Sequence, residues 1–138
     1  MNPTHTPSAL KTASLSVTAQ TILAYAELTN DFNLIHVDAG FAAKTPMGRP
    51  IAHGTMSLCL LMQCLQRNFG VQALQTLDLD VRFVKPIFIG DAITAGGEPS
   101  ESQAGQWNVW VRGEDGSDRI VGTVALDADS SLPPGDRA

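Results

Sequence analysis

The sequence has few cysteines, few aromatic residues and no long apolar run, and each shortage excludes a class of protein. Two cysteines in 138 residues cannot build a disulfide framework, and with three histidines they match no zinc-ligand spacing. No stretch of eighteen apolar residues exists, so we expect no membrane span. Nine basic residues against fourteen acidic ones give a net charge of −5 without a basic cluster, which argues against a nucleic-acid partner.

Several sequence motifs are missing as well. The chain contains no GxGxxG, no Walker loop and no GxSxG, which disfavours nucleotide binding and triad hydrolysis. MNPTHTPSALK, at the N-terminus, has no charged region followed by an apolar one, so we expect a cytoplasmic protein. The length suits one domain, expected over residues 12–128 between a flexible lead-in (1–11) and a flexible tail (129–138).

One strongly apolar helix is the most informative element of the sequence. Residues 54–69 read GTMSLCLLMQCLQRNF, with almost no polar stripe before Gln66, which predicts a helix enclosed by protein on most sides. At 1.5 Å per residue it is roughly 24 Å long, too short to cross a membrane. We expect Cys59 and Cys64 to be buried small hydrophobic side chains, since a disulfide within a helix is geometrically awkward.

Shorter periodic segments surround this helix. We expect one helix from the N-cap Thr18 to Leu28, and a second near 38–43, capped by Asp38, inside an otherwise irregular stretch. Alternation with a period of two predicts strands with one buried face, and Gly96-Gly97 predicts an irregularity. The expected strands cover residues 12–17, 77–83, 91–100, 106–113 and 119–128. A curved antiparallel sheet wrapped around the apolar helix accommodates these elements, which is the hot-dog fold of the α+β class.

Candidate chemistry lies in the stretch DFNLIHVD and at the start of the apolar helix. Asp31 and His36 are five residues apart in a turn-rich segment, so their side chains can converge into an acid/base pair. His53 and Gly54 stand where the helix begins and where unpaired N–H groups are presented. Because Gly54 has no side chain to block its N–H, an oxyanion could be stabilised there. Taken alone, an Asp and a His at this spacing more often belong to a turn without a catalytic role, and a glycine at the start of a helix more often serves packing than binding.

Residues 29–56, TNDFNLIHVDAGFAAKTPMGRPIAHGTM, resemble the MaoC-like hydratase family, the (R)-specific enoyl-CoA hydratases. They match D-x-N-x-[IL]-H-x-D, then an A/F-rich helix, then G-R-P-I-[AV]-H-G. The resemblance implies that Asp31 and His36 hold the water that adds to C3 of a 2-enoyl thioester, while the Gly54 N–H binds the thioester oxygen. It implies a homodimer joined edge to edge, and no cofactor beyond the coenzyme A of the substrate. No metal is expected. The residues expected on the substrate side are Asn33, which would brace the loop, Ile51, His53, which would mainly fix the turn before the helix, and Met62.

One position departs from the pattern, and two other functions stay open. Some family members have a serine nine residues after the HG histidine, where this chain has Met62, whose bulk predicts a preference for short or branched acyl chains. An acyl-thioester hydrolase on the same fold is disfavoured because no acidic residue lies between Gly54 and Phe69. A non-catalytic module that binds acyl thioesters would tolerate the loss of Asp31 and His36.

Overall fold

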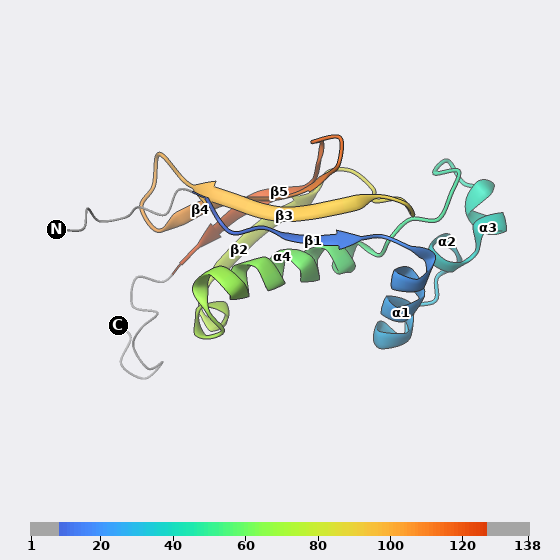
Figure 1. Cartoon of the computed structure of the whole chain (residues 1–138), viewed down its shortest axis with the longest axis horizontal. Coiled ribbons are helices and arrows are strands. Elements are labelled where there is room, and N and C mark those ends of the chain that lie inside the picture. The colour runs from blue at the N-terminus through green and yellow to red at the C-terminus, as the bar shows by residue number, and fades with distance from the viewer. Residues whose placement is uncertain (1–8, 127–138) are drawn as a thin grey trace.

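The computed structural model describes residues 9–126, where five strands form one antiparallel sheet and a long helix lies across it (Figure 1). The strands are β1 (Ala13–Ser16), β2 (Asp78–Phe83), β3 (Ala92–Pro99), β4 (Gln106–Gly113) and β5 (Asp118–Ala125), in the order β1-β3-β4-β5-β2. The helices are α1 (Ala19–Thr29), α2 (Leu34–Val37), α3 (Ala39–Ala43) and α4 (Gly54–Phe69), followed by the 3-10 turn η1 (Gln72–Gln75). The expected hot-dog arrangement is confirmed.

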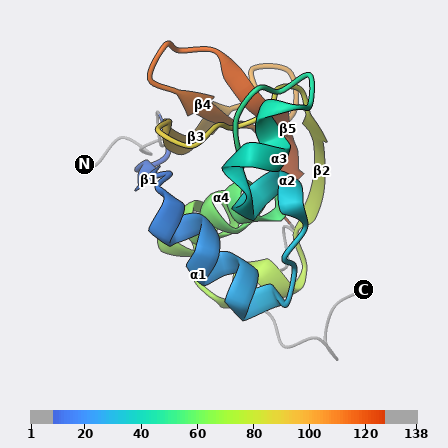
Figure 2. The same cartoon turned by 90° about the vertical axis from the view of Figure 1, so that its right-hand side faces the viewer.

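The hydrophobic core lies between α4 and the concave face of the sheet, which curves around the helix (Figure 2). Leu61 and Leu65 of α4 are fully buried, as are Ile93, Val111 and Ile120 on three neighbouring strands. Each such side chain contributes roughly 1.5–3 kcal/mol relative to an exposed one, so this contact holds the helix against the sheet.

The expectation that protein encloses α4 on most sides is wrong for one face. Cys59 is exposed, and Leu58 and Met62 are only half-buried. The reason is that α1 and β1 flank this face but leave an apolar groove of about 580 Å³ open between them and α4. Burial is therefore confirmed for Cys64 and wrong for Cys59, and both thiols are free.

Two details of the sheet also differ from expectation. The β3–β4 register runs without a break through Gly96 and Gly97, and the irregularity falls instead between Val111 and Arg112. A side chain at Gly96 would displace Trp110, because a Cβ there would come within 2.5 Å of the Trp110 ring. Phe83 is in phase with the half-buried Leu79 and Val81 of β2, yet it is 55% exposed, since β2 is an edge strand and its end lies beyond the core.

Helices α1, α2 and α3 gather at the end of the molecule where α4 begins (Figures 1 and 2). The Thr18 hydroxyl accepts from the Thr21 N–H at 3.0 Å and caps α1 as expected. Likewise, Asp38 caps α3 by accepting from the Phe41 N–H at 2.9 Å. The sequence did not predict α2, which lies in the stretch expected to be irregular.

The boundaries of the expected domain are partly visible. Leu10 is buried and its N–H donates to the Gly97 carbonyl at 2.9 Å, so packing begins within the expected lead-in 1–11. The expected tail, 129–138, lies outside the described residues. Within the described part, no helix has both the length and the apolar character needed to cross a membrane.

Candidate active site

Asp31 follows directly on the end of α1. Asn30 adopts a left-handed conformation with φ 56°, which ends the helix and turns the chain. The Asn33 N–H then donates to Asp31 Oδ1 at 3.2 Å, and Asn33 Oδ1 accepts from the Ile35 N–H at 3.2 Å as the N-cap of α2. Asn33 thus links the Asp31 carboxylate to the helical turn that carries His36.

His36 lies on α2 with a defined ring orientation. Its Nδ1 is 2.8 Å from the carbonyl oxygen of Ile51. A carbonyl oxygen can only accept, so Nδ1 carries the hydrogen and donates it. In the neutral ring Nε2 therefore holds a free lone pair, which is the form that accepts a proton from a nearby group.

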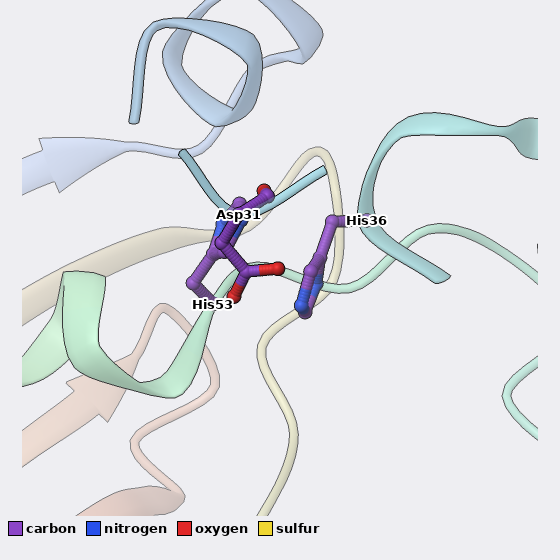
Figure 3. A group of neighbouring side chains, drawn as sticks. All are labelled: Asp31, His36 and His53. Atoms are coloured by element: carbon purple, nitrogen blue, oxygen red, sulfur yellow. The ribbon is translucent and has the colours of Figure 1, made fainter. Parts of the chain in front are cut away.

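Three side chains from separate segments meet here: exposed Asp31, half-buried His36 and buried His53 (Figure 3). One coordinating atom of each lies within 4.8 Å of the other two. His53 Nε2 donates to the Asp31 carbonyl oxygen at 2.9 Å, and its ring stacks on His36 with centroids 3.9 Å apart. The structure thus brings Asp31 and His36 together, from the end of α1 and from a helical turn, not from one free loop.

The same trio contains metal-ligating residue types, but its geometry suits hydrogen bonding better. The His36 and His53 rings are stacked with an interplanar angle of 26°. The lone pair of each ring nitrogen lies in the plane of its own ring, and these two planes are stacked face to face. One nitrogen of each ring also already donates to a backbone carbonyl. A carboxylate beside an imidazole lone pair in this arrangement can bind and deprotonate a water molecule.

Gly54 is the first residue of α4 and lines a pocket of about 310 Å³. Its N-cap, His53, makes no capping hydrogen bond with its side chain, so the first-turn N–H groups keep the partial positive charge of the helix end. Ile51, Ser57 and Phe83 line the same pocket. The Ser57 hydroxyl donates to the Gly54 carbonyl at 2.7 Å, which turns it away from the N–H groups.

Met62, expected on the substrate side, lines a different pocket from Gly54. It is half-buried and lines the groove between α1, β1 and α4, whereas it does not line the Gly54 pocket. Ile51 contacts His36 and also lines the Gly54 pocket, and His53 directly precedes Gly54, but Asp31, His36 and His53 do not line that pocket and Met62 lines another one. Its separation follows from the helix, because residue 62 lies eight residues, or roughly 12 Å, along α4 from residue 54.

Two residues near the site were not singled out from the sequence. Tyr25 looked like one more apolar position of its helix, but its hydroxyl donates to Thr55 Oγ1 at 2.7 Å and its ring lies 5.0 Å from that of His53. Burial raises the pKa of the Tyr25 phenol above its ordinary value, so it remains a donor at neutral pH. Phe83 borders Gly54, since a Cβ at residue 54 would lie 3.3 Å from its ring. No spacing in the sequence signals either contact.

Comparison with known proteins identifies the family. A family model described as "MaoC like domain" matches residues 2–119. The chain belongs to this family. Among curated MaoC-like relatives, the (R)-specific enoyl-CoA hydratase of Aeromonas caviae is 36% identical over 77 residues, which are 56% of this chain and 58% of that protein. The 3-hydroxybutyryl-CoA dehydratase of Methylorubrum extorquens is 31% identical over 85 residues, covering 62% of this chain and 54% of that one.

Solved structures share the MaoC-like fold over most of the chain. The A. caviae (R)-hydratase involved in PHA biosynthesis superposes with a TM-score of 0.69 at 25% identity, over 89% of this chain and 99% of that one. The curated matches span only a little more than half the length of those relatives, whereas the structural match covers nearly the whole of the hydratase.

Proposed function

We propose that this protein is a hydratase, or in reverse a dehydratase, acting on 2-enoyl and (R)-3-hydroxyacyl thioesters. The observation that carries the proposal is the convergence of the Asp31 carboxylate and the His36 ring, within 4.8 Å, beside the first turn of α4. Relatives named as an enoyl-CoA hydratase and a 3-hydroxybutyryl-CoA dehydratase support the same reaction class.

The proposed reaction adds water across the C2–C3 double bond. The Asp31 carboxylate and the His36 Nε2 lone pair accept the hydrogens of one water molecule, whose oxygen forms the bond to C3. One water proton passes to this pair, and a proton returns from the pair to C2 on the same face. The Gly54 N–H donates a hydrogen bond to the thioester oxygen and stabilises the enolate charge that develops there.

This reaction needs no metal or separate cofactor, because acid/base groups and a hydrogen-bond donor supply all of its proton transfers. Coenzyme A enters only as part of the substrate. The cytoplasm remains the proposed location, supported by the two free thiols, since reducing compartments keep cysteines unpaired.

We also propose a homodimer formed through β2. This strand pairs only with β5 in the described sheet, so its other edge is open, and exposed edge strands are templates for pairing. Phe83 and Val84 at its end are 55% and 48% exposed. Sedimentation should give twice the chain mass, and Val84→Asp should shift it toward the monomer; a monomeric wild type contradicts the proposal.

The direct test follows the ultraviolet absorbance of crotonyl-CoA, which falls as the double bond is hydrated. Asp31→Asn and His36→Ala should each lower kcat/KM by roughly 10²–10⁴, the usual contribution of an acid/base group. Glu101→Gln, at an exposed carboxylate between β3 and β4 and away from the β2 edge, serves as the control and should leave the rate unchanged.

Three outcomes would redirect the proposal. Release of free coenzyme A thiol with the absorbance change would indicate a hydrolase. Binding of the thioester without turnover would indicate a non-catalytic module. Full activity in both site variants would show that the water is activated elsewhere.

A further inference from the structure

His53 is the most buried member of the site, although it stands at the beginning of α4. Its residue surface is 2% exposed, and its ring lies between two others. On one side it stacks on His36 at 3.9 Å, and on the other the tilted ring of Tyr25 lies 5.0 Å away. Three rings from α2, the α4 N-cap and α1 thus form a continuous column, which we call the ring column (Tyr25, His53, His36).

The hydrogen bond of His53 ties this column to Asp31. Nε2 donates to the Asp31 carbonyl oxygen at 2.9 Å, across 22 residues of sequence. Asp31 is exposed, and among the described residues its carboxylate accepts a hydrogen bond only from the N–H of Asn33. Because this bond holds the main chain of Asp31, it fixes the position of the Asp31 Cα atom. It leaves both carboxylate oxygens available for other hydrogen bonds.

The same short segment also sets the position of His36. Ile51, two residues before His53, accepts from Nδ1 of His36, while the His53 ring supports the face of His36. One bond fixes the rotation of the His36 ring and the stacking contact fixes its plane. Both proposed acid/base groups therefore take their positions from residues 51–53.

Tyr25 supports the column from behind. Its hydroxyl donates at 2.7 Å to Oγ1 of Thr55, the second residue of α4. The Tyr25 ring is thereby fixed relative to the same helix end that carries His53. Movement of His53 away from His36 would have to displace this ring.

We infer that His53 is a positioning residue of the site: held by Tyr25, it places the Asp31 main chain and the His36 ring so that the carboxylate and Nε2 face one water molecule. The inference rests on the proposed hydratase function and adds to it a residue that acts through others without contacting the reacting atoms. A displacement of about 1 Å in such a site can cost roughly a hundredfold in rate.

The test uses substitutions that separate the ring from the hydrogen bond. His53→Phe keeps a flat ring for stacking but removes the Nε2 donor, and His53→Gln keeps a donor without the ring. In crotonyl-CoA hydration, His53→Phe should lower kcat roughly ten- to a hundredfold while KM changes less than about twofold. His53→Gln should recover part of that loss, and it provides a second readout if the phenylalanine variant folds poorly.

A double-variant cycle asks whether His53 acts through His36. In the His36→Ala background, adding His53→Phe should lower kcat by much less than it does in the wild type, because the residue being positioned has gone. Phe69→Leu is the matched control for lost ring packing, since the ring centroids of Phe69 and Trp107 lie 5.2 Å apart near the opposite end of α4. It should lower the melting temperature and leave kcat unchanged.

Each contrary result has a distinct meaning. Wild-type kcat in His53→Phe and His53→Gln, a rise in KM alone, or full additivity with His36→Ala would overturn the positioning role while leaving the hydratase intact. A wild-type protein that hydrates no enoyl thioester would overturn the proposed function and this role with it.

Discussion

Replacing Gly54 by alanine tests the proposed oxyanion position with the smallest possible change. The new methyl group would stand at the mouth of the pocket beside the first N–H of α4. It would lie 3.3 Å from Phe83 Cε1, which is closer than an ordinary contact. Phe83 is 55% exposed, so its ring can move by the few tenths of an ångström required.

The magnitudes separate an effect on activity from an effect on folding. Alanine is favoured over glycine within a helix by up to about 1 kcal/mol, which offsets the cost of moving Phe83, so stability should change by less than about 1 kcal/mol. A methyl group that keeps the thioester oxygen away from the N–H removes one oxyanion donor. Such a loss costs roughly 10²–10³ in kcat, equivalent to about 2.7–4 kcal/mol.

The assay is crotonyl-CoA hydration beside thermal unfolding, with Gly40→Ala as the matched control. Gly40 also lies in the first turn of a helix, and a Cβ there meets a side-chain atom, Asp38 Oδ1, at the same 3.3 Å. The control should keep its activity. The reasoning is refuted if Gly54→Ala retains wild-type kcat, or if adding Phe83→Ala restores the rate, since the methyl group would then act only by displacing the phenyl ring.

Three further predictions concern separate parts of the molecule. Met62→Ser tests whether the groove between α1, β1 and α4 takes the acyl chain: the smaller side chain should widen the groove and raise the rate on long acyl thioesters relative to crotonyl-CoA, and a flat chain-length profile in both proteins removes this idea. A thiol reagent should label Cys59 rapidly and Cys64 only after denaturation, since burial raises the pKa of the Cys64 thiol; equal labelling rates would contradict this. The N–H and hydroxyl of Ser117 hold the pKa of the Asp115 carboxyl below its ordinary value. The unfolded chain then binds the proton more readily, so this contribution to stability is complete above an unfolded pKa of about 3.9 and is lost as the pH falls through the folded value. Asp115→Ala should therefore lower the melting temperature at neutral pH but not in strong acid. A difference in melting temperature between wild type and variant that does not change with pH would refute this prediction.

The fold could be predicted because its signals are local. Thr18 and Asp38 are good N-cap residues, and each caps the helix expected from it. Alternating side chains marked all five strands to within a few residues, because a pleated strand buries every second side chain. One fully apolar helix then left few ways to cover it.

Other features depend on contacts that local patterns do not encode. Cys59 looked buried because its neighbours are apolar, but whether the exposed side of α4 is covered depends on where α1 lies. Phe83 follows the alternation of β2, yet it is exposed because the core ends before the strand does. Spacing alone suggested that Asp31 and His36 meet, but it contained no sign of the bond between His53 and the Asp31 carbonyl, which joins segments 22 residues apart.

The N-cap of α4 shows how this fold keeps a binding position open. In the described residues, α1, α2 and α3 all begin with a side chain that accepts from a first-turn N–H, whereas α4 does not. A serine, threonine, aspartate or asparagine at residue 53 would contribute about 1 kcal/mol by capping the helix. His53 instead turns its ring toward Asp31 and His36. The longest helix in the described chain thus gives up a stabilising side-chain cap. Its Met56 N–H donates to the His53 carbonyl at 3.0 Å, whereas the Gly54 N–H has no partner among the described residues and can bind an oxygen atom that develops negative charge.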